Sequence, residues 1–297
     1  MSARDFALLF FVCVIWAANN IVSKFVVAHL GVPPLFYAGV RFAVVLAAVF
    51  AWLRPVPKPL WRLISVGVLM GAGTFALVFM ALKTASPSAV AIVSQMGVPM
   101  TTLLGFLILG ERLTARRLVG VALTLAGALT VMWDPHGFKV SAGLWYVVAA
   151  SSLSSLGAVL LKQMEGVKPL QLQAWVGLCS LVPMIVLSAW LEPGQIEAGI
   201  AAGWPFVAAV LFSGLIVSVA GHTIYYGLIQ RYEANLISPL TLMTPLATIA
   251  LGVLFTHDQF DPRMALGTAV ALVGVLVIAL RPNQMIALLV ALRRRVG

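Results

Sequence analysis

The chain has 297 residues, of which 62% are hydrophobic and only 9% are charged, with a net charge of +10. Soluble domains are typically about 45–50% apolar and about 25% charged, so this sequence cannot cover a globule with polar side chains. Its mean hydropathy of +1.05 indicates a protein that lies almost entirely in lipid. Two cysteines, Cys13 and Cys179, lie in apolar runs and are too few for a disulfide framework, a zinc knuckle or an iron–sulfur site. No metal or cofactor is expected.

Ten apolar runs follow one another along the chain, each close to the roughly 20 residues that a bilayer crossing needs. They cover residues 6–28, 35–53, 63–82, 89–109, 115–132, 144–161, 170–191, 204–229, 234–255 and 264–280. The runs are continuous rather than alternating, which predicts helices and not the strands of a membrane barrel. The predicted fold class is an all-α polytopic membrane protein with ten transmembrane helices.

Capping residues mark the starts of three of these helices. Ser86 precedes Pro87, Thr114 precedes the fifth run, and Asp261 precedes Pro262. Serine, threonine and aspartate accept hydrogen bonds from the first free N–H groups of a helix, and proline fits its first position. The three residues therefore predict helix starts at 87, 115 and 262.

The positive charges lie mostly on one side of the predicted membrane. Only Lys83, Lys139 and Arg263 fall on the other side. By the positive-inside rule both termini are cytoplasmic, as an even number of helices requires. The basic balance therefore reflects topology, and no nucleic-acid partner is expected. Residues 283–297 are too short to span, and we interpret them as a basic cytoplasmic tail facing anionic lipid headgroups or as a non-native remnant.

The two halves of the chain are weakly but collinearly similar. With one inserted residue, 99–127 aligns with 245–274, so that Pro99 meets Pro245, and upstream Lys24 meets Lys162. We predict one five-helix unit over 1–138 and a second over 139–282. Because five is odd, the second unit enters the membrane from the opposite side, so the repeats are inverted. Many secondary transporters use this architecture for alternating access, with the substrate near the midplane.

These features resemble the drug/metabolite transporter superfamily, and within it the EamA-type exporters. The resemblance covers residues 4–282 and rests on the ten-helix pattern, IWAANN at 15–20 and LGERLT at 109–114. It implies export of amino acids, aromatic or neutral, or of related metabolites across a bacterial inner membrane, without ATP. The counterpart of Leu109-Gly110-Glu111 in the second half reads HDQ at 257–259, so a symmetric glutamate pair is not expected.

One face of the first helix combines Trp16 with Asn19 and Asn20. Polar side chains at the bilayer centre face a cavity or the bundle interior, so we predict that these residues line a substrate cavity. Hydrogen bonding between helices is the alternative.

Two midplane prolines, Pro99 and Pro245, lie on predicted helices four and nine. Their polar neighbours are Ser94, Gln95, Thr241 and Thr244. Proline removes one helical hydrogen bond, so the carbonyls of Gln95 and Thr241, four residues earlier, are predicted to meet a substrate ammonium or water. A kink satisfied by nearby side chains is the alternative.

His222, Tyr225 and Tyr226 share a face of the eighth predicted helix. His222 is a candidate for substrate binding or proton transfer, and a buried neutral histidine bonded to a neighbouring helix is the alternative.

Arg41 lies deeper in its helix than a loop requires and is a candidate for binding a substrate carboxylate. Snorkelling of its long side chain to the interface is the alternative. Tyr37 and Trp175 are repeat counterparts and are secondary candidates for gate or wall positions.

The residues together predict a secondary transporter that exports small molecules by alternating access. Acidic residues map to loops or helix ends, so transport is predicted to be facilitated and not obligatorily proton-coupled. A multidrug or nucleoside exporter, and less favourably a channel, are the alternatives. An enzyme is not expected, because the sequence has no Gly-Lys-Ser/Thr phosphate loop, His-Glu-x-x-His site or Gly-x-Ser-x-Gly elbow. The sequence does not predict an oligomeric state.

Overall fold

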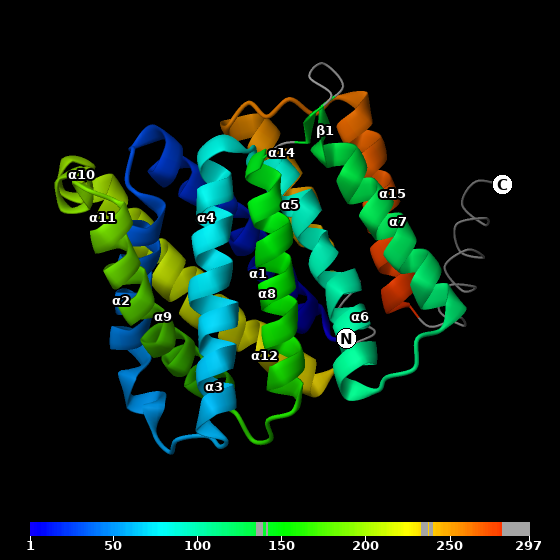
Figure 1. Cartoon of the computed structure of the whole chain (residues 1–297), viewed down its shortest axis with the longest axis horizontal. Helices are drawn as coiled ribbons and strands as arrows, with labels where there is room; N and C mark the ends of the chain where they lie inside the picture. Colours follow the sequence, from blue (N-terminus) through cyan, green and yellow to red (C-terminus); the bar gives the residue numbers. More distant parts are fainter. Residues whose placement is uncertain (135–138, 141, 233–236, 238–239, 281–297) are drawn as a thin grey trace.

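The first half of the chain forms five helical spans in the computed structural model (Figure 1). The structure describes residues 1–134, 139–140, 142–232, 237 and 240–280. The elements of this half are α1 (Ala3–Lys24) with η1 (Phe25–His29), α2 (Pro34–Val49) with η2 (Phe50–Leu53), α3 (Leu60–Gly67) with η3 (Val68–Gly73) and α4 (Thr74–Thr84), α5 (Pro87–Val93) with η4 (Ser94–Met96) and α6 (Gly97–Leu109), and α7 (Ala115–Met132). The segments η1 and η3 are π-helical turns, and η2 and η4 are 3₁₀ turns.

The second half begins after a short antiparallel pair of strands, β1 (Trp133–Asp134) and β2 (Lys139–Val140), which the sequence did not predict. Its helices are α8 (Ala142–Lys162), α9 (Pro169–Leu191), α10 (Gln195–Ala201), α11 (Gly203–Leu211) with the π-helical η5 (Phe212–Gly221) and α12 (His222–Arg231), α14 (Met243–Phe255), and α15 (Pro262–Ala279).

The prediction of an all-α polytopic membrane protein is confirmed. Within the described residues, nine helices are long and apolar enough to cross a membrane, and α14 is a shorter apolar helix. The predicted span 234–255 is seen only from its turn at Leu240 onward and at Ile237, because the other residues at its start lie outside the described part of the chain. The predicted caps are also confirmed: Ser86, Thr114 and Asp261 each accept a hydrogen bond from a backbone N–H of the helix that follows.

The helices pair across the middle of the sequence. α7 packs along α15, α2 packs along α9, and α5 packs on α14. In addition, α4 and α6 pack on α8, while η5 and α14 pack on α1. These are the pairs expected when two five-helix units are related by a two-fold axis. They are consistent with a division of the chain between residues 138 and 139, and that division stays a prediction.

The loops after α6 and after α14 have the same backbone geometry. Gly110 and His257 both have a positive φ, of 66° and 51°, and the next N–H donates to the carbonyl of Gly105 (3.2 Å) or Gly252 (3.1 Å). Asp258 therefore occupies the place of Glu111. The sequence pattern HDQ looked degenerate because its left-handed position is filled by histidine, although glycine takes this conformation with less strain.

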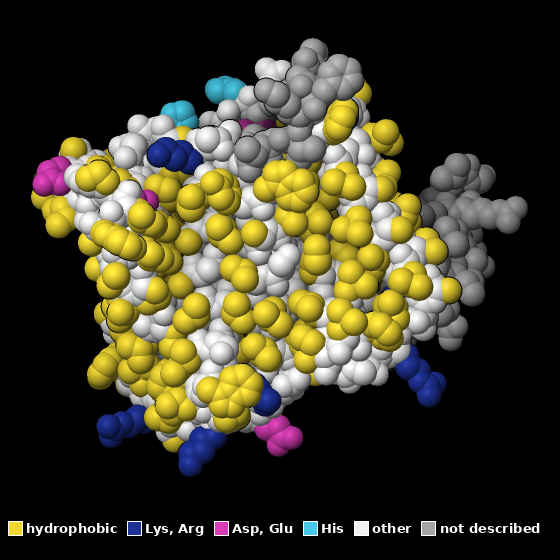
Figure 2. Space-filling model, viewed as in Figure 1, with side chains coloured by type: hydrophobic (Ala, Val, Ile, Leu, Met, Phe, Trp, Pro, Cys, Tyr) yellow, Lys and Arg dark blue, Asp and Glu magenta, His cyan; other side chains and the backbone are white. Residues whose placement is uncertain are grey.

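Figure 2 shows hydrophobic side chains over most of one face of the bundle. On this face Lys and Arg gather at the end where α3 begins and are sparse at the opposite end, where α4 ends. The apolar band suits lipid contact, and the uneven charge agrees with the predicted orientation.

The contact between α7 and α15 depends on glycine. A Cβ atom at Gly127 would overlap the backbone of Ala271 and the carbonyl of Gly267, and a Cβ at Gly274 would overlap Thr124. Without side chains the two backbones approach closely, as membrane helices with small residues at their interface do.

We expect Gly127→Ala to lower the free energy of unfolding by about 1–3 kcal/mol, because the added methyl group overpacks this contact. The thermal midpoint of the purified protein in detergent measures the effect. Gly227→Ala is the matched control, since no described atom lies within 4 Å of a Cβ built there. Equal midpoints for the two variants would contradict the close contact.

Candidate functional site

Arg41 is the most deeply buried charged side chain at the centre of the bundle. It extends from α2 and is 1% exposed. Its Nη2 and Nε atoms donate to the Ser218 hydroxyl at 2.7 and 3.2 Å, and Nε also lies 3.3 Å from the Ser213 carbonyl. The guanidinium carbon lies 3.9 Å from the centroid of the Phe75 ring. Cation–π contact and two serine oxygens therefore stabilise the buried charge.

No carboxylate pairs with Arg41 in the described part of the chain. The ion pairs found there involve Glu111, Asp5 and Asp261, at the ends of helices. The Nη1 atom of Arg41 is buried and has no described hydrogen-bond acceptor. Burying a charge without a counter-ion is costly, and ionisable groups at membrane depth mark functional sites by default. The arrangement is suited to an anionic group that arrives from outside the fold.

A chain of hydroxyl groups fixes the position of Arg41. The Tyr37 hydroxyl lies 2.6 Å from the Ser213 hydroxyl, which donates to Asn19 Oδ1 at 2.7 Å. The Ser218 hydroxyl donates to the Ser213 carbonyl at 2.8 Å. These bonds connect α1, α2 and η5. The structure thus brings together the predicted residues Asn19, Tyr37 and Arg41.

An aromatic cluster lies beside this polar chain. The Trp16 ring is 5.2 Å from the His222 ring and 5.0 Å from the Tyr225 ring, between centroids. His222 Nδ1 lies 3.2 Å from the carbonyls of Val217 and Ser218, so the imidazole carries its proton there. Both carbonyls belong to η5, in the same span as His222, so this bond is local and does not join His222 to a neighbouring helix. Tyr226 belongs to α12, but its side chain is outside the described part of the structure.

A cavity of about 40 Å³ adjoins Arg41. Its polar lining comes from Arg41, Ser218 and His222 together with Gln173 of α9. A water molecule occupies about 30 Å³ in the liquid, so this cavity has room for one or two waters and is too small for an amino acid. In the described part of the structure, the space beside Arg41 is therefore closed to an amino acid.

The remaining predicted residues of helices one and nine form a separate polar contact. Asn20 Nδ2 lies 3.5 Å from the Thr248 hydroxyl, which donates to the Thr244 carbonyl at 2.9 Å. Pro245 is buried in the same turn, and the Thr241 carbonyl accepts the N–H of Thr244 at 2.9 Å. The Asn20–Thr248 contact joins α14 to α1, and the other two bonds are local to the start of α14.

The break near Pro99 is satisfied by neighbouring side chains. Just before this buried proline the helix tightens into η4, which contains Ser94 and Gln95. The Ser94 carbonyl lies 3.5 Å from the Ser151 hydroxyl, and the Gly97 carbonyl accepts the Ser155 hydroxyl at 2.9 Å. The N–H of Gly97 is bonded to the Ser94 and Gln95 carbonyls. This is the local alternative to an open carbonyl site.

Trp175 lies away from the Arg41 cluster. Its indole N–H donates to the Leu53 carbonyl at 3.2 Å, at the end of the second span. Sequence reasoning missed Phe75 and Ser213, and also Gln173. Ser213 was detectable as a polar residue in an apolar run, but nothing in the sequence distinguishes Phe75 from other core aromatics.

Comparison with known proteins adds the following matches. Residues 6–133 and 141–280 match the EamA-like transporter family. The chain is similar to the "probable amino-acid metabolite efflux pump" of Escherichia coli K12, at 28% identity over 93% of this chain and 94% of that protein. It is 24% identical to the "probable terminal-alkyne amino-acid exporter" of Streptantibioticus cattleyicolor, over 60% of this chain and 59% of that protein. A solved crystal structure at 20% identity has the same fold, with a TM-score of 0.60 over 93% of this chain and 96% of that one.

We expect Arg41→Met to leave the thermal midpoint unchanged or to raise it. Replacing a buried charge by an apolar side chain of similar size is often neutral or stabilising, and the Ser218 hydroxyl keeps its bond to the Ser213 carbonyl. Thermal unfolding in detergent tests this.

Arg62→Met is the matched control for that measurement. Arg62 donates to the Gln163 carbonyl at 2.9 Å, so its replacement is expected to cost about 1 kcal/mol. A loss of more than about 3 kcal/mol in Arg41→Met would show that the fold itself requires the guanidinium.

Proposed function

The chain belongs to the EamA-like transporter family, and from this premise we propose that it exports amino acids or related small metabolites from the cytoplasm. The proposed substrate class rests on the buried guanidinium of Arg41, which lacks a carboxylate partner among the described residues. The names of relatives that refer to amino-acid export support the same class.

Arg41 is proposed to bind the substrate carboxylate through its Nη1 edge. Arginine presents planar N–H donors that match a carboxylate, and a charge-assisted bond in a water-poor site is stronger than one in water. The Trp16 and Tyr225 rings supply an apolar surface for the substrate side chain. A neutral or aromatic amino acid has the required combination of anionic group and apolar body.

Transport is proposed to occur by alternating access between two inverted units, 1–138 and 139–282. Support comes from the helix pairs across the sequence and from the matching loops at Glu111 and Asp258. The uneven distribution of Lys and Arg supports cytoplasmic termini, and the bacterial relatives support a location in the inner membrane.

Two other functions are less well supported by the same site. A lipophilic cation would meet the positive charge of Arg41, which disfavours a multidrug exporter of cationic compounds. A nucleoside offers no anionic group. A channel needs a continuous path, whereas the described cavity beside Arg41 is about 40 Å³.

The function is tested by efflux from proteoliposomes loaded with L-phenylalanine, L-leucine, L-threonine, a purine or a lipophilic cation. We expect saturable efflux of at least one amino acid. Arg41→Met and Arg41→Lys are expected to reduce it at least tenfold, because lysine keeps the charge but not the planar fork. Asn19→Ala, which releases the Ser213 hydroxyl, is expected to reduce it less. Absence of transport for every solute would contradict the proposal.

Transport is expected to be uncoupled from protons. Described acidic side chains lie at helix ends or in loops, as the contacts of Asp5, Glu111 and Asp258 show. A membrane-buried carboxylate relay, the common carrier of protons in transporters, is therefore not available in the described spans. Accumulation of the amino acid against its gradient under an imposed pH difference would refute this prediction, and equilibration alone would support it.

A further inference from the structure

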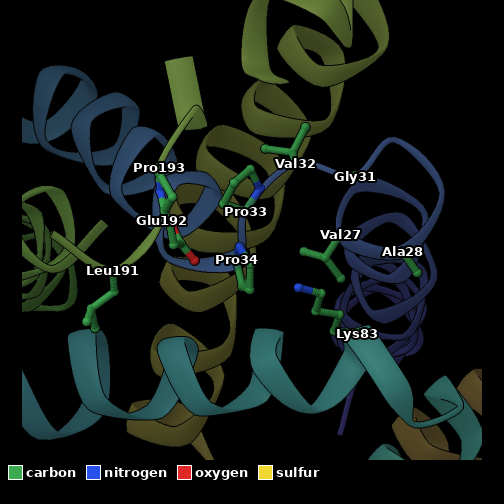
Figure 3. A pocket seen from close by; sticks show the side chains of 10 residues that line it. All are labelled: Val27, Ala28, Gly31, Val32, Pro33, Pro34, Lys83, Leu191, Glu192 and Pro193. Atoms are coloured by element: carbon green, nitrogen blue, oxygen red, sulfur yellow. The ribbon is translucent and has the colours of Figure 1, made fainter. Parts of the chain in front are cut away.

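A large cavity opens at the end of the bundle opposite the start of α1, between the end of η1, the start of α2, the end of α4 and the end of α9 (Figure 3). Its volume is about 550 Å³, more than ten times that of the cavity beside Arg41. Ligand pockets typically measure about 300–1,000 Å³. We name this space the vestibule.

The vestibule carries one charge of each sign. Lys83 extends into it from α4, and Glu192 lies on the opposite wall at the end of α9 (Figure 3). Among the described ion pairs none involves either residue. The Glu192 carboxylate accepts the N–H groups of Leu35 and Phe36 at 2.9 Å and the Ser188 hydroxyl at 2.8 Å. A carboxylate has about four acceptor positions, so it retains capacity for one more donor.

Helix α4 connects the vestibule to the Arg41 site, because Lys83 lines the one and Phe75 lines the other. On α4, Phe75, Phe79 and Lys83 are four residues apart and share one face. Phe75 stacks on Arg41, and Phe79 stacks on Tyr37 with 4.8 Å between ring centroids. Successive layers are about 6 Å apart at 1.5 Å per residue. Tyr37 and Phe79 are fully buried and line neither cavity, and we infer from their position on α2 and α4 that they lie between the two spaces.

We propose that the vestibule is a second binding site on the export path, which receives the zwitterion after it passes the Tyr37–Phe79 layer. Lys83 takes the carboxylate that leaves Arg41, and Glu192 faces the ammonium group. This inference rests on the proposed function and orientation. It adds an outward-facing site for free α-amino acids, with Lys83 as its carboxylate-binding residue.

The test is the effect of external amino acid on efflux. Proteoliposomes or cells are loaded with the fastest-moving labelled amino acid of the panel above, and the same unlabelled amino acid is added outside at increasing concentration. The external concentration that gives half-maximal exchange is expected to rise at least fivefold in Lys83→Gln and to recover in Lys83→Arg. The external α-amide of that amino acid, which keeps the ammonium group but lacks the carboxylate, is tested as an inhibitor of this exchange. The amide concentration that gives half-maximal inhibition is expected to be the same in wild type and Lys83→Gln.

Lys58→Gln is the matched control, because Lys58 is an exposed lysine of the loop before α3, at the opposite end of the bundle. It is expected to leave the external half-maximal concentration unchanged. An unchanged value in Lys83→Gln while efflux persists would overturn the vestibule site and leave the proposed function intact. A shift of equal size for the amide would also overturn it, since Lys83 would then act through structure alone. If wild-type protein moves no amino acid at all, the proposed function fails and the vestibule site falls with it.

Discussion

A guanidinium held inside a membrane bundle without a counter-ion is the constraint around which the centre of this protein is built. The charge cannot leave, because Arg41 is enclosed by α2, η5 and Phe75. It must instead be solvated by an aromatic face and by serine oxygens, and these oxygens must be held in place. The bonds from Ser213 to Tyr37 and Asn19 meet that need and at the same time join α1 to α2 and η5. The hydrogen bonds that position Arg41 are therefore also bonds that hold the helices together.

A second set of hydrogen bonds joins α9 to α2. α9 is fastened to α2 at both ends, by Glu192 on the N–H groups of Leu35 and Phe36 and by Trp175 and Gln171 on carbonyls after α2. By contrast, η3 and η5 are π-helical segments in the third and eighth spans. Segments of this kind often occur at functional sites. Phe75 follows η3, and Ser213 and Ser218 lie in η5, so both π-segments adjoin Arg41.

Much of the fold was predictable because bilayer thickness imposes its length on every span. The helix starts at Ser86, Thr114 and Asp261 followed from capping chemistry, which is local in sequence. The site was predictable only in part. Arg41 and Asn19 are detectable as polar residues at membrane depth, whereas Phe75 looks like any apolar residue until the packing of α4 on α2 is known. The correspondence between Asp258 and Glu111 was also not visible in the sequence. It appears only in the backbone geometry of the two loops.

The partial solvation of Arg41 has a further consequence for transport. A carrier must release its substrate. A guanidinium that made no hydrogen bonds to the protein would bind a carboxylate too tightly for turnover in a site without water. Here the Ser218 hydroxyl and the Ser213 carbonyl accept bonds from Nε and Nη2, Phe75 stacks on the guanidinium, and the Nη1 atom is left without a described acceptor. The binding free energy of a carboxylate therefore comes mainly from its bonds to the Nη1 edge. The free-energy cost of removing the cation from water is already included in folding. Such a site recognises the anionic group and still lets it leave.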